Sequence, residues 1–220
     1  MIISEIFYSL QGEGALSGIP SAFIRTAGCP LRCNWCDTPN AAAQARGKEM
    51  EVAEISALIA GYPTQHCVVT GGEPLIAYDL PELTQALREA GIHITIETSG
   101  VLPPKNILCD LASISPKLAN SRPHDAAWTL RHEAMRRRPA ILREWLERFP
   151  CQLKFVICDL VADLAEIDAL LAEVGCEISP EKILLMPEGR THHNATRIAQ
   201  ACLARGWRYC DRLHVRLNLP

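Results

Sequence analysis

Three cysteines lie within eight residues of one stretch, "GCPLRCNWCDTPN", at Cys29, Cys33 and Cys36. The glycine and prolines around them are typical of a loop. Thiolates in such a loop bind either zinc or iron–sulfur clusters. A structural zinc ion usually takes four protein ligands in two pairs, and no second pair follows here. Three neighbouring cysteines suit a [4Fe-4S] cluster in which one iron keeps an open position.

Other metal ligands along the chain are poorer partners for this loop. Cys67 lies in an apparent strand, and His192 and His193 are interpreted as the beginning of a helix behind Thr191. A zinc-binding protein, or one whose cluster only transfers electrons, nevertheless remains an alternative. Four protein ligands at the loop would distinguish either from a cluster with an open iron.

Composition limits the kind of protein that carries the loop. The chain has 220 residues, ten cysteines and a formal net charge of −3, which gives no electrostatic reason to expect nucleic-acid binding. The arginines at 136–138 are interpreted as an exposed helix end. No leader peptide and no apolar run of membrane-spanning length is recognisable. We expect a cytoplasmic protein without a membrane partner, whose seven other cysteines are buried apolar residues rather than disulfides.

The elements that must position the loop follow from hydrophobic periodicity, because runs rich in Val and Ile alternate with stretches of helical period. Strands are predicted at 21–28, 66–71, 92–98, 107–115, 152–158, 182–187 and 212–217, and helices near 50–60, 79–90, 138–149, 161–174 and 192–205. The long segment 117–139 is expected to be irregular, either a cover over the active site or an exposed insertion.

Repeated strand–helix–strand units predict an α/β fold with parallel pairing, and they are too few for a closed eightfold barrel. We expect residues 1–220 to form a single domain, an open partial β/α barrel of about six mostly parallel strands. The cysteine loop follows the first barrel strand. A doubly wound sheet is the alternative, and in both folds function lies at the carboxyl ends of the strands.

The spacing C-x-x-x-C-x-x-C, with the aromatic Trp35 before the last cysteine, resembles the signature of radical S-adenosylmethionine enzymes. The resemblance implies that S-adenosylmethionine chelates the open iron, and that an electron from the reduced cluster splits it into methionine and a 5′-deoxyadenosyl radical. It also implies an external one-electron donor such as flavodoxin or ferredoxin. "TGGEP" at 70–74 matches the segment that binds the cofactor's amino group, although alone it reads as a strand-to-helix turn.

A narrower resemblance extends along the chain. The stretches "EIFYSLQGEG" (5–14), "GIPSAFIR" (18–25), "ETSG" (97–100), "SPKLAN" (115–120) and "RLHV" near the C-terminus resemble the 7-carboxy-7-deazaguanine synthase family. That family implies a homodimeric lyase that converts 6-carboxy-5,6,7,8-tetrahydropterin to 7-carboxy-7-deazaguanine with loss of ammonia, a step toward queuosine and other 7-deazapurines. A radical activase of a glycyl-radical protein has the same cysteine triplet and is the alternative.

The resemblance also implies roles for individual residues, although it marks none as certainly catalytic. The expected substrate-binding residues are Leu10, Gln11, Gly12, Glu13, Arg25, Thr70 and Pro220. The expected S-adenosylmethionine-binding residues are Trp35, Asp37, Gly72, Glu73, Ser115, Lys117, Met186 and Glu188. Thr38 is expected to contact Mg²⁺, which keeps waters and takes its other ligands from the substrate. A salt bridge is the alternative role for Arg25, and an exposed position the alternative for Lys117.

Overall fold

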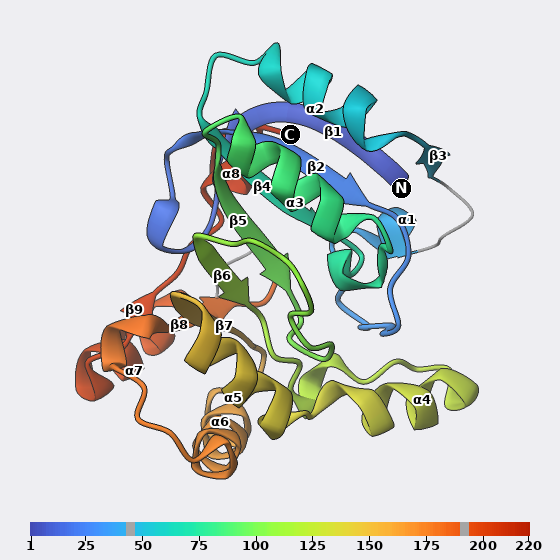
Figure 1. Ribbon diagram of the computed structural model, residues 1–220. Helices are drawn as coiled ribbons and strands as arrows, with labels where there is room; N and C mark the ends of the chain where they lie inside the picture. The colour runs from blue at the N-terminus through green and yellow to red at the C-terminus, as the bar shows by residue number, and fades with distance from the viewer. Residues whose placement is uncertain (43–46, 190–193) are drawn as a thin grey trace.

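The computed structural model describes residues 1–42, 47–189 and 194–220, and the strands within these ranges form one nine-stranded sheet (Figure 1). Its order is β3-β1-β2-β4-β5-β6-β7-β8-β9. The strands are β1 (Ile2–Leu10), β2 (Pro20–Thr26), β3 (Lys48–Glu49), β4 (His66–Gly71), β5 (His93–Thr98), β6 (Leu111–Ile114), β7 (Cys151–Ile157), β8 (Ile183–Pro187) and β9 (Arg208–Tyr209).

Parallel pairing runs without interruption from β2 to β9, whereas β1 is antiparallel to both β2 and β3. The sheet has two ends and does not close, so the predicted open α/β fold with mostly parallel strands is confirmed. The cysteine loop follows β2, the first strand of the parallel series, as the sequence indicated.

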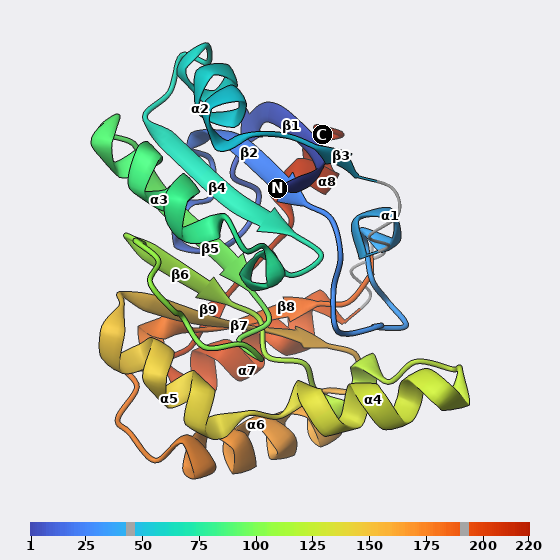
Figure 2. The same ribbon diagram turned by 45° about the vertical axis from the view of Figure 1, so that its right-hand side comes forward.

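Helices cover the outer face of the curved sheet, as Figures 1 and 2 show for α2, α3, α5, α6 and α7. The helices are α1 (Pro39–Ala42), α2 (Val52–Ala60), α3 (Leu80–Glu89), α4 (Ala126–Arg136), α5 (Pro139–Arg148), α6 (Leu160–Val174), α7 (Ala195–Arg205) and α8 (Leu213–Leu217). None of the helices in the described ranges is long and apolar enough to cross a bilayer.

Alternation along each strand divides the sheet into an apolar outer face and a polar inner face. On β7, Leu153 and Phe155 join the hydrophobic core under the helices, whereas Lys154 between them points inward. On β5, Ile96 joins the same core and Glu97 lines the inner face. Buried polar residues are therefore concentrated on the side of the sheet that the outer helices leave uncovered.

Two predicted elements need correction, and strands β1, β3 and β9 were not foreseen. In the predicted strand 212–217, residues Leu213–Leu217 form α8 instead, because the chain turns across the sheet end and Leu213 N donates to Gly12 O at 2.8 Å. The segment 117–139 is not irregular throughout, because α4 occupies its centre. The unforeseen strand β1 pairs with β2. His192 and His193, predicted to begin a helix, lie outside the described residues, and α7 begins at Ala195.

Candidate active site

A cavity of about 460 Å³ opens on the inner face at the carboxyl ends of the parallel strands. Its wall contains Cys29, Cys33 and Cys36. All the other site residues expected from the sequence also line it, except Glu73 and Glu188. Tertiary structure therefore brings together residues drawn from the two ends and the middle of the chain.

The first turn of the cysteine loop packs directly against the "TGGEP" segment. Glu73 N donates to Gly28 O at 2.9 Å, and Gly72 N donates to Thr26 O at 3.1 Å. A Cβ atom on Gly72 would lie 2.1 Å from Gly28 O and 2.9 Å from Cys29 Cβ. Because no side chain fits in that space, glycine at position 72 lets two backbone segments meet beside the first cysteine.

The thiols sit in an environment that disfavours free thiolates. Burial raises the pKa of the Cys29 thiol to about 12, and the nearby Glu73 carboxylate acts in the same direction. Burial also raises the pKa of Cys33, which the charge of Lys117 opposes. A bound cationic centre reverses such a preference, because thiolates are the ligating form.

The donor set fits a cluster with several irons. Within the described ranges, no group of three or more His, Cys, Asp or Glu side chains is placed to hold one metal ion. Instead, Cys29, Cys33 and Cys36 open separately onto the same cavity. In a [4Fe-4S] cluster each cysteine sulfur bonds a different iron, so spread thiols on one wall are what such a group needs.

An indole and a lysine lie together in the wall of the cavity. Trp35 Nε1 donates to Asn120 O at 3.1 Å, which holds the ring at the cavity edge. Lys117 Nζ donates to Ser115 Oγ at 2.8 Å and lies 5.3 Å from the centre of the Trp35 ring. Lys117 is thus held inside the site rather than in the exposed position that was its alternative.

Polar groups next to the cysteine loop are exposed to the cavity. Thr38 Oγ1 lies 3.5 Å from Asp37 Oδ1 and 3.9 Å from Cys36 Sγ. Both Thr38 and Asp37 line the cavity, so their oxygens are available to a ligand placed beside the last cysteine.

The opposite end of the cavity carries a buried polar network centred on Glu97. Its carboxylate accepts from Gln11 Nε2 at 3.1 Å and from Thr70 Oγ1 at 3.0 Å. The Gln11 amide is oriented in turn, because Glu13 N donates to Gln11 Oε1 at 3.2 Å. The loop after β1 is therefore bonded to the carboxyl ends of β4 and β5.

Lys154 adds a buried positive charge beside this network. Burial by itself would lower the pKa of its ammonium group, but Glu13 and Glu97 outweigh burial and raise that pKa above the usual range. Lys154 forms an ion pair with Glu13, and Arg212 Nε lies 3.9 Å from Glu13 Oε1. The network therefore presents charges of both signs to a bound molecule.

Arg25 forms an ion pair and also lines the cavity. Its Nε donates to Glu5 Oε1 at 2.6 Å, which is the salt bridge considered as the alternative. Its guanidinium also lies over the Phe7 ring, 5.5 Å from the centroid, and Arg25 lines the cavity. A carboxylate in the cavity could compete with Glu5 for the same planar group.

The C-terminal residues close one side of the cavity. Ser9 Oγ donates to Pro220 O at 3.1 Å. A Cβ on Gly12 would lie 1.9 Å from His214 Nδ1, so α8 packs closely onto the loop after β1. Pro220 therefore lines the same cavity as Leu10 and Gln11, which the family resemblance also assigned to the substrate.

Two expected cofactor residues lie outside the main cavity. Glu73 is fully buried and accepts from Thr98 Oγ1 at 2.7 Å and Ser99 N at 2.9 Å, and it supports the wall from behind. Glu188 lines a separate cavity of about 70 Å³ with Cys158 and Asn194.

Several cavity residues were missed by sequence reasoning. They are Glu97, Lys154, Ser113, Arg32, Arg212 and His214. For Ser113 and Lys154 a signal existed, because each is a polar residue between apolar neighbours in a predicted strand, and Glu97 likewise follows the apolar Ile96 in one. Arg212 and His214 belong to the "RLHV" stretch already noted, but the segment was predicted as a strand and no role was assigned to them.

Comparisons with known proteins agree with this geometry. The sequence profile of the Radical SAM superfamily matches residues 23–147. The chain is similar to proteins named 7-carboxy-7-deazaguanine synthase. It is 42% identical to the one from Halobacterium salinarum, over 98% of this chain and 89% of that relative. It is 33% identical to the one from Escherichia coli K12, over 99% of this chain and 98% of that relative.

Solved structures give the same result. QueE from Escherichia coli matches with a TM-score of 0.73 and 28% identity, over 97% of this chain and 94% of that one. SuiB from Streptococcus suis matches with a TM-score of 0.59 and 15% identity over 85% of this chain and 47% of that one, a likeness of fold alone. The comparisons favour the synthase over the glycyl-radical activase and over a zinc protein.

Proposed function

Because the chain belongs to the Radical SAM superfamily, and within it to the 7-carboxy-7-deazaguanine synthase family, we propose that it converts 6-carboxy-5,6,7,8-tetrahydropterin to 7-carboxy-7-deazaguanine with loss of ammonia. One observation carries the proposal. The three cysteines and the polar network around Glu97 share one cavity, so a cluster-bound cofactor and a polar bicyclic substrate can meet there.

Cys29, Cys33 and Cys36 would hold a [4Fe-4S] cluster, and Gly72, Trp35, Ser115 and Lys117 would surround S-adenosylmethionine beside it. When bound, these groups supply the one-electron chemistry that yields a carbon radical. The chain's own contribution is placement. The close approach at Gly72 and the hydrogen bond from Lys117 to Ser115 set the shape of this half of the cavity.

The other half of the cavity would bind the pterin. Glu97 and Gln11 offer an acceptor and a donor to the polar edge of a heterocycle. Lys154 keeps a buried positive charge beside them, and Arg25 is placed to exchange Glu5 for the substrate carboxylate. A substrate bound between these walls would displace water, which would protect a radical from side reactions.

Further parts of the proposal concern ions and partners. Thr38, with Asp37 nearby, would contact Mg²⁺, whose remaining ligands would be waters and the substrate carboxylate. We also propose an external one-electron donor such as flavodoxin or ferredoxin, a homodimer, and a cytoplasmic location. These follow from the family assignment.

The decisive experiment is anaerobic. The protein is reconstituted with iron and sulfide, supplied with reductant, Mg²⁺, S-adenosylmethionine and the tetrahydropterin, and the product is identified by mass. Cys36→Ala is expected to abolish turnover, whereas Cys202→Ala, which alters a buried cysteine on α7, should retain it. Cofactor cleavage without the deazaguanine would leave the radical chemistry in place and refute the substrate.

A further inference from the structure

The middle of the cysteine loop is bound to the segment 117–139, for which the sequence analysis left open a cover over the active site or an exposed insertion. Arg32 N donates to His132 Nδ1 at 3.2 Å, and Asn34 N donates to Ser121 O at 3.1 Å. The side chain of Arg32 stacks on Trp128, with 4.2 Å from guanidinium to ring centre, while its NH1 donates to Cys29 O at 2.7 Å. Two successive turns of α4 thus contact the one residue that directly precedes Cys33.

His132 and Ser121 are both fully buried in this contact. The His132 side chain is 0% exposed, and its Nε2 lies 2.9 Å from Ser121 Oγ. Ser121 Oγ donates its own proton to Leu118 O at 2.6 Å, so it accepts from His132 Nε2. The ring therefore carries its proton on Nε2 and uses Nδ1 as acceptor for Arg32 N, which only a neutral imidazole can do.

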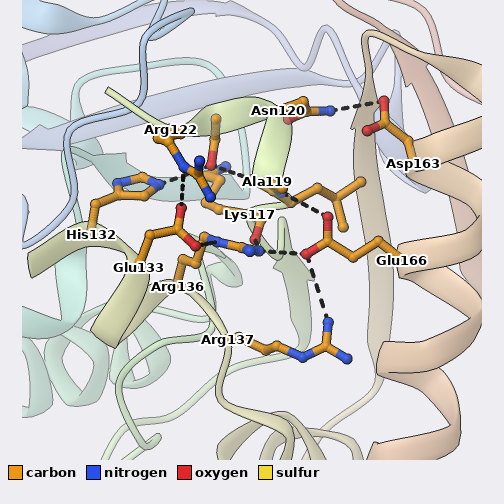
Figure 3. Close-up of polar contacts among 12 residues, drawn as sticks. Lys117, Ala119, Asn120, Arg122, His132, Glu133, Arg136, Arg137, Asp163 and Glu166 are labelled. Atoms are coloured by element: carbon orange, nitrogen blue, oxygen red, sulfur yellow. Dashed lines mark hydrogen bonds and ion pairs between the residues drawn. The ribbon is translucent and has the colours of Figure 1, made fainter. Parts of the chain in front are cut away.

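The helix that carries His132 is itself braced against the end of β6 and against α6, as Figure 3 shows. Arg136 NH1 donates to Lys117 O at 3.1 Å and to Glu166 Oε1 at 2.5 Å. Ala119 N donates to Glu166 Oε2 at 2.7 Å, and Arg122 Nε donates to Glu133 Oε1 at 3.2 Å. The imidazole therefore has a rigid support.

We propose that His132 is a positioning residue for the cluster, which holds the backbone between Cys29 and Cys33 in the conformation that presents both thiols to the cavity. The inference rests on the proposed function only in assigning the cysteines to a cluster. Without the Nδ1 acceptor, the Arg32 N–H would be buried and unpaired. The cysteine loop would then relax away from the conformation that binds the cluster.

The test compares two substitutions of nearly equal shape. His132→Asn retains an acceptor near the position of Nδ1, whereas His132→Leu fills the same space without one. Thr84→Val is the matched control, because Thr84 is also fully buried and its Oγ1 accepts from Leu108 N at 3.1 Å, far from the cavity on α3. Two quantities are measured: hydrogen exchange of the Arg32 amide in the protein without cluster, and the rate at which a chelator removes iron from the reconstituted protein.

We expect His132→Leu to accelerate both exchange at Arg32 and iron release roughly tenfold, as the loss of one buried hydrogen bond implies. His132→Asn should stay close to the wild type, and Thr84→Val should change neither quantity. Equal behaviour of the Asn and Leu variants, or wild-type values in the Leu variant, would overturn the proposal.

Should His132→Leu fail to fold, Ser121→Ala decides, because it removes the group that orients the ring. Faster exchange at Arg32 supports the proposal and unchanged exchange refutes it. Exchange at Arg32 does not involve the pterin, so it separates this inference from the substrate assignment.

Discussion

Lys154 and Glu13, which are 141 residues apart in the chain, form a buried ion pair across the floor of the cavity. The side chains are only 8% and 12% exposed. Strand β7 thus holds the loop after β1 by charge as well as by packing. Two other contacts have the same effect, since Ala15 N donates to Gln152 Oε1 at 2.8 Å and Gly14 N donates to Cys210 Sγ at 3.2 Å.

Removing one partner of this ion pair should destabilise the folded protein. Glu13→Leu leaves the Lys154 ammonium buried with less compensation, and we expect a loss of about 3–5 kcal/mol in the free energy of unfolding. Adding Lys154→Met removes the stranded charge and should restore much of that loss. Urea unfolding of the protein without cluster measures both. The two side chains would not be coupled if the double variant lost as much free energy of unfolding as Glu13→Leu and Lys154→Met lose together when each is measured alone.

A methyl group at position 72 should disrupt the cysteine loop. In Gly72→Ala the new Cβ would overlap Gly28 O, a backbone atom that cannot move away without shifting Cys29. We expect most of the iron and sulfide to be absent after reconstitution. Gly61→Ala is the control, because its φ is −76° and its Cβ would approach no atom closer than 3.3 Å. A full complement of iron in Gly72→Ala would show that the loop adapts.

Removal of the last two residues should affect the substrate rather than the cofactor. Leu219 N donates to His214 O at 2.9 Å and Pro220 O accepts from Ser9, so the tail is fixed along the cavity wall. We expect KM for the pterin to rise roughly tenfold, the effect of losing one charged or well-placed contact. Cleavage of S-adenosylmethionine without pterin should be unchanged. Ser9→Ala, which removes only one contact, should show a smaller rise, and an unaltered KM after truncation would exclude the tail from the pocket.

The stability of the fold should depend on pH through His132. Burial lowers its pKa, and the positive charges of Arg136, Lys117 and Arg122 act the same way while Glu133 opposes them. Below about pH 6.5, the ordinary value for histidine, the unfolded chain therefore binds a proton that the folded protein does not. The contribution of His132 is complete above that pH and is lost as the pH falls toward the lowered pKa.

Urea unfolding at a series of pH values compares the wild type with His132→Asn. The wild type should lose stability more steeply than the variant as the pH drops below 6.5. His66, whose pKa burial also lowers, is present in both proteins and cancels in the comparison. Parallel curves would mean that the imidazole is not held in its neutral form.

Some local features of the structure could be predicted from the sequence alone. The spacing of Cys29, Cys33 and Cys36 determines ligand geometry within one loop, and glycines at 71 and 72 mark a close backbone approach because they lack a Cβ. The strands of the parallel series from β2 to β8 were recognisable because both sheet faces are buried, whereas the two-residue β9 was not predicted. The stretch 107–115 contains only a short strand, β6. Asp110, just before it, instead accepts hydrogen bonds from Ile94 N and Arg88 through its carboxylate.

The sequence by itself therefore determined the class of fold and the cluster loop, since these depend on periodicity and on spacing between near neighbours, whereas the other residues expected to line the cavity came from the family resemblance. Only the tertiary structure decided that "RLHVRL" is a helix closing the cavity, that Lys154 meets Glu13, and that His132 supports Arg32. Each of these depends on contacts between residues distant along the chain. Their strength comes from burial, which no short stretch of sequence records.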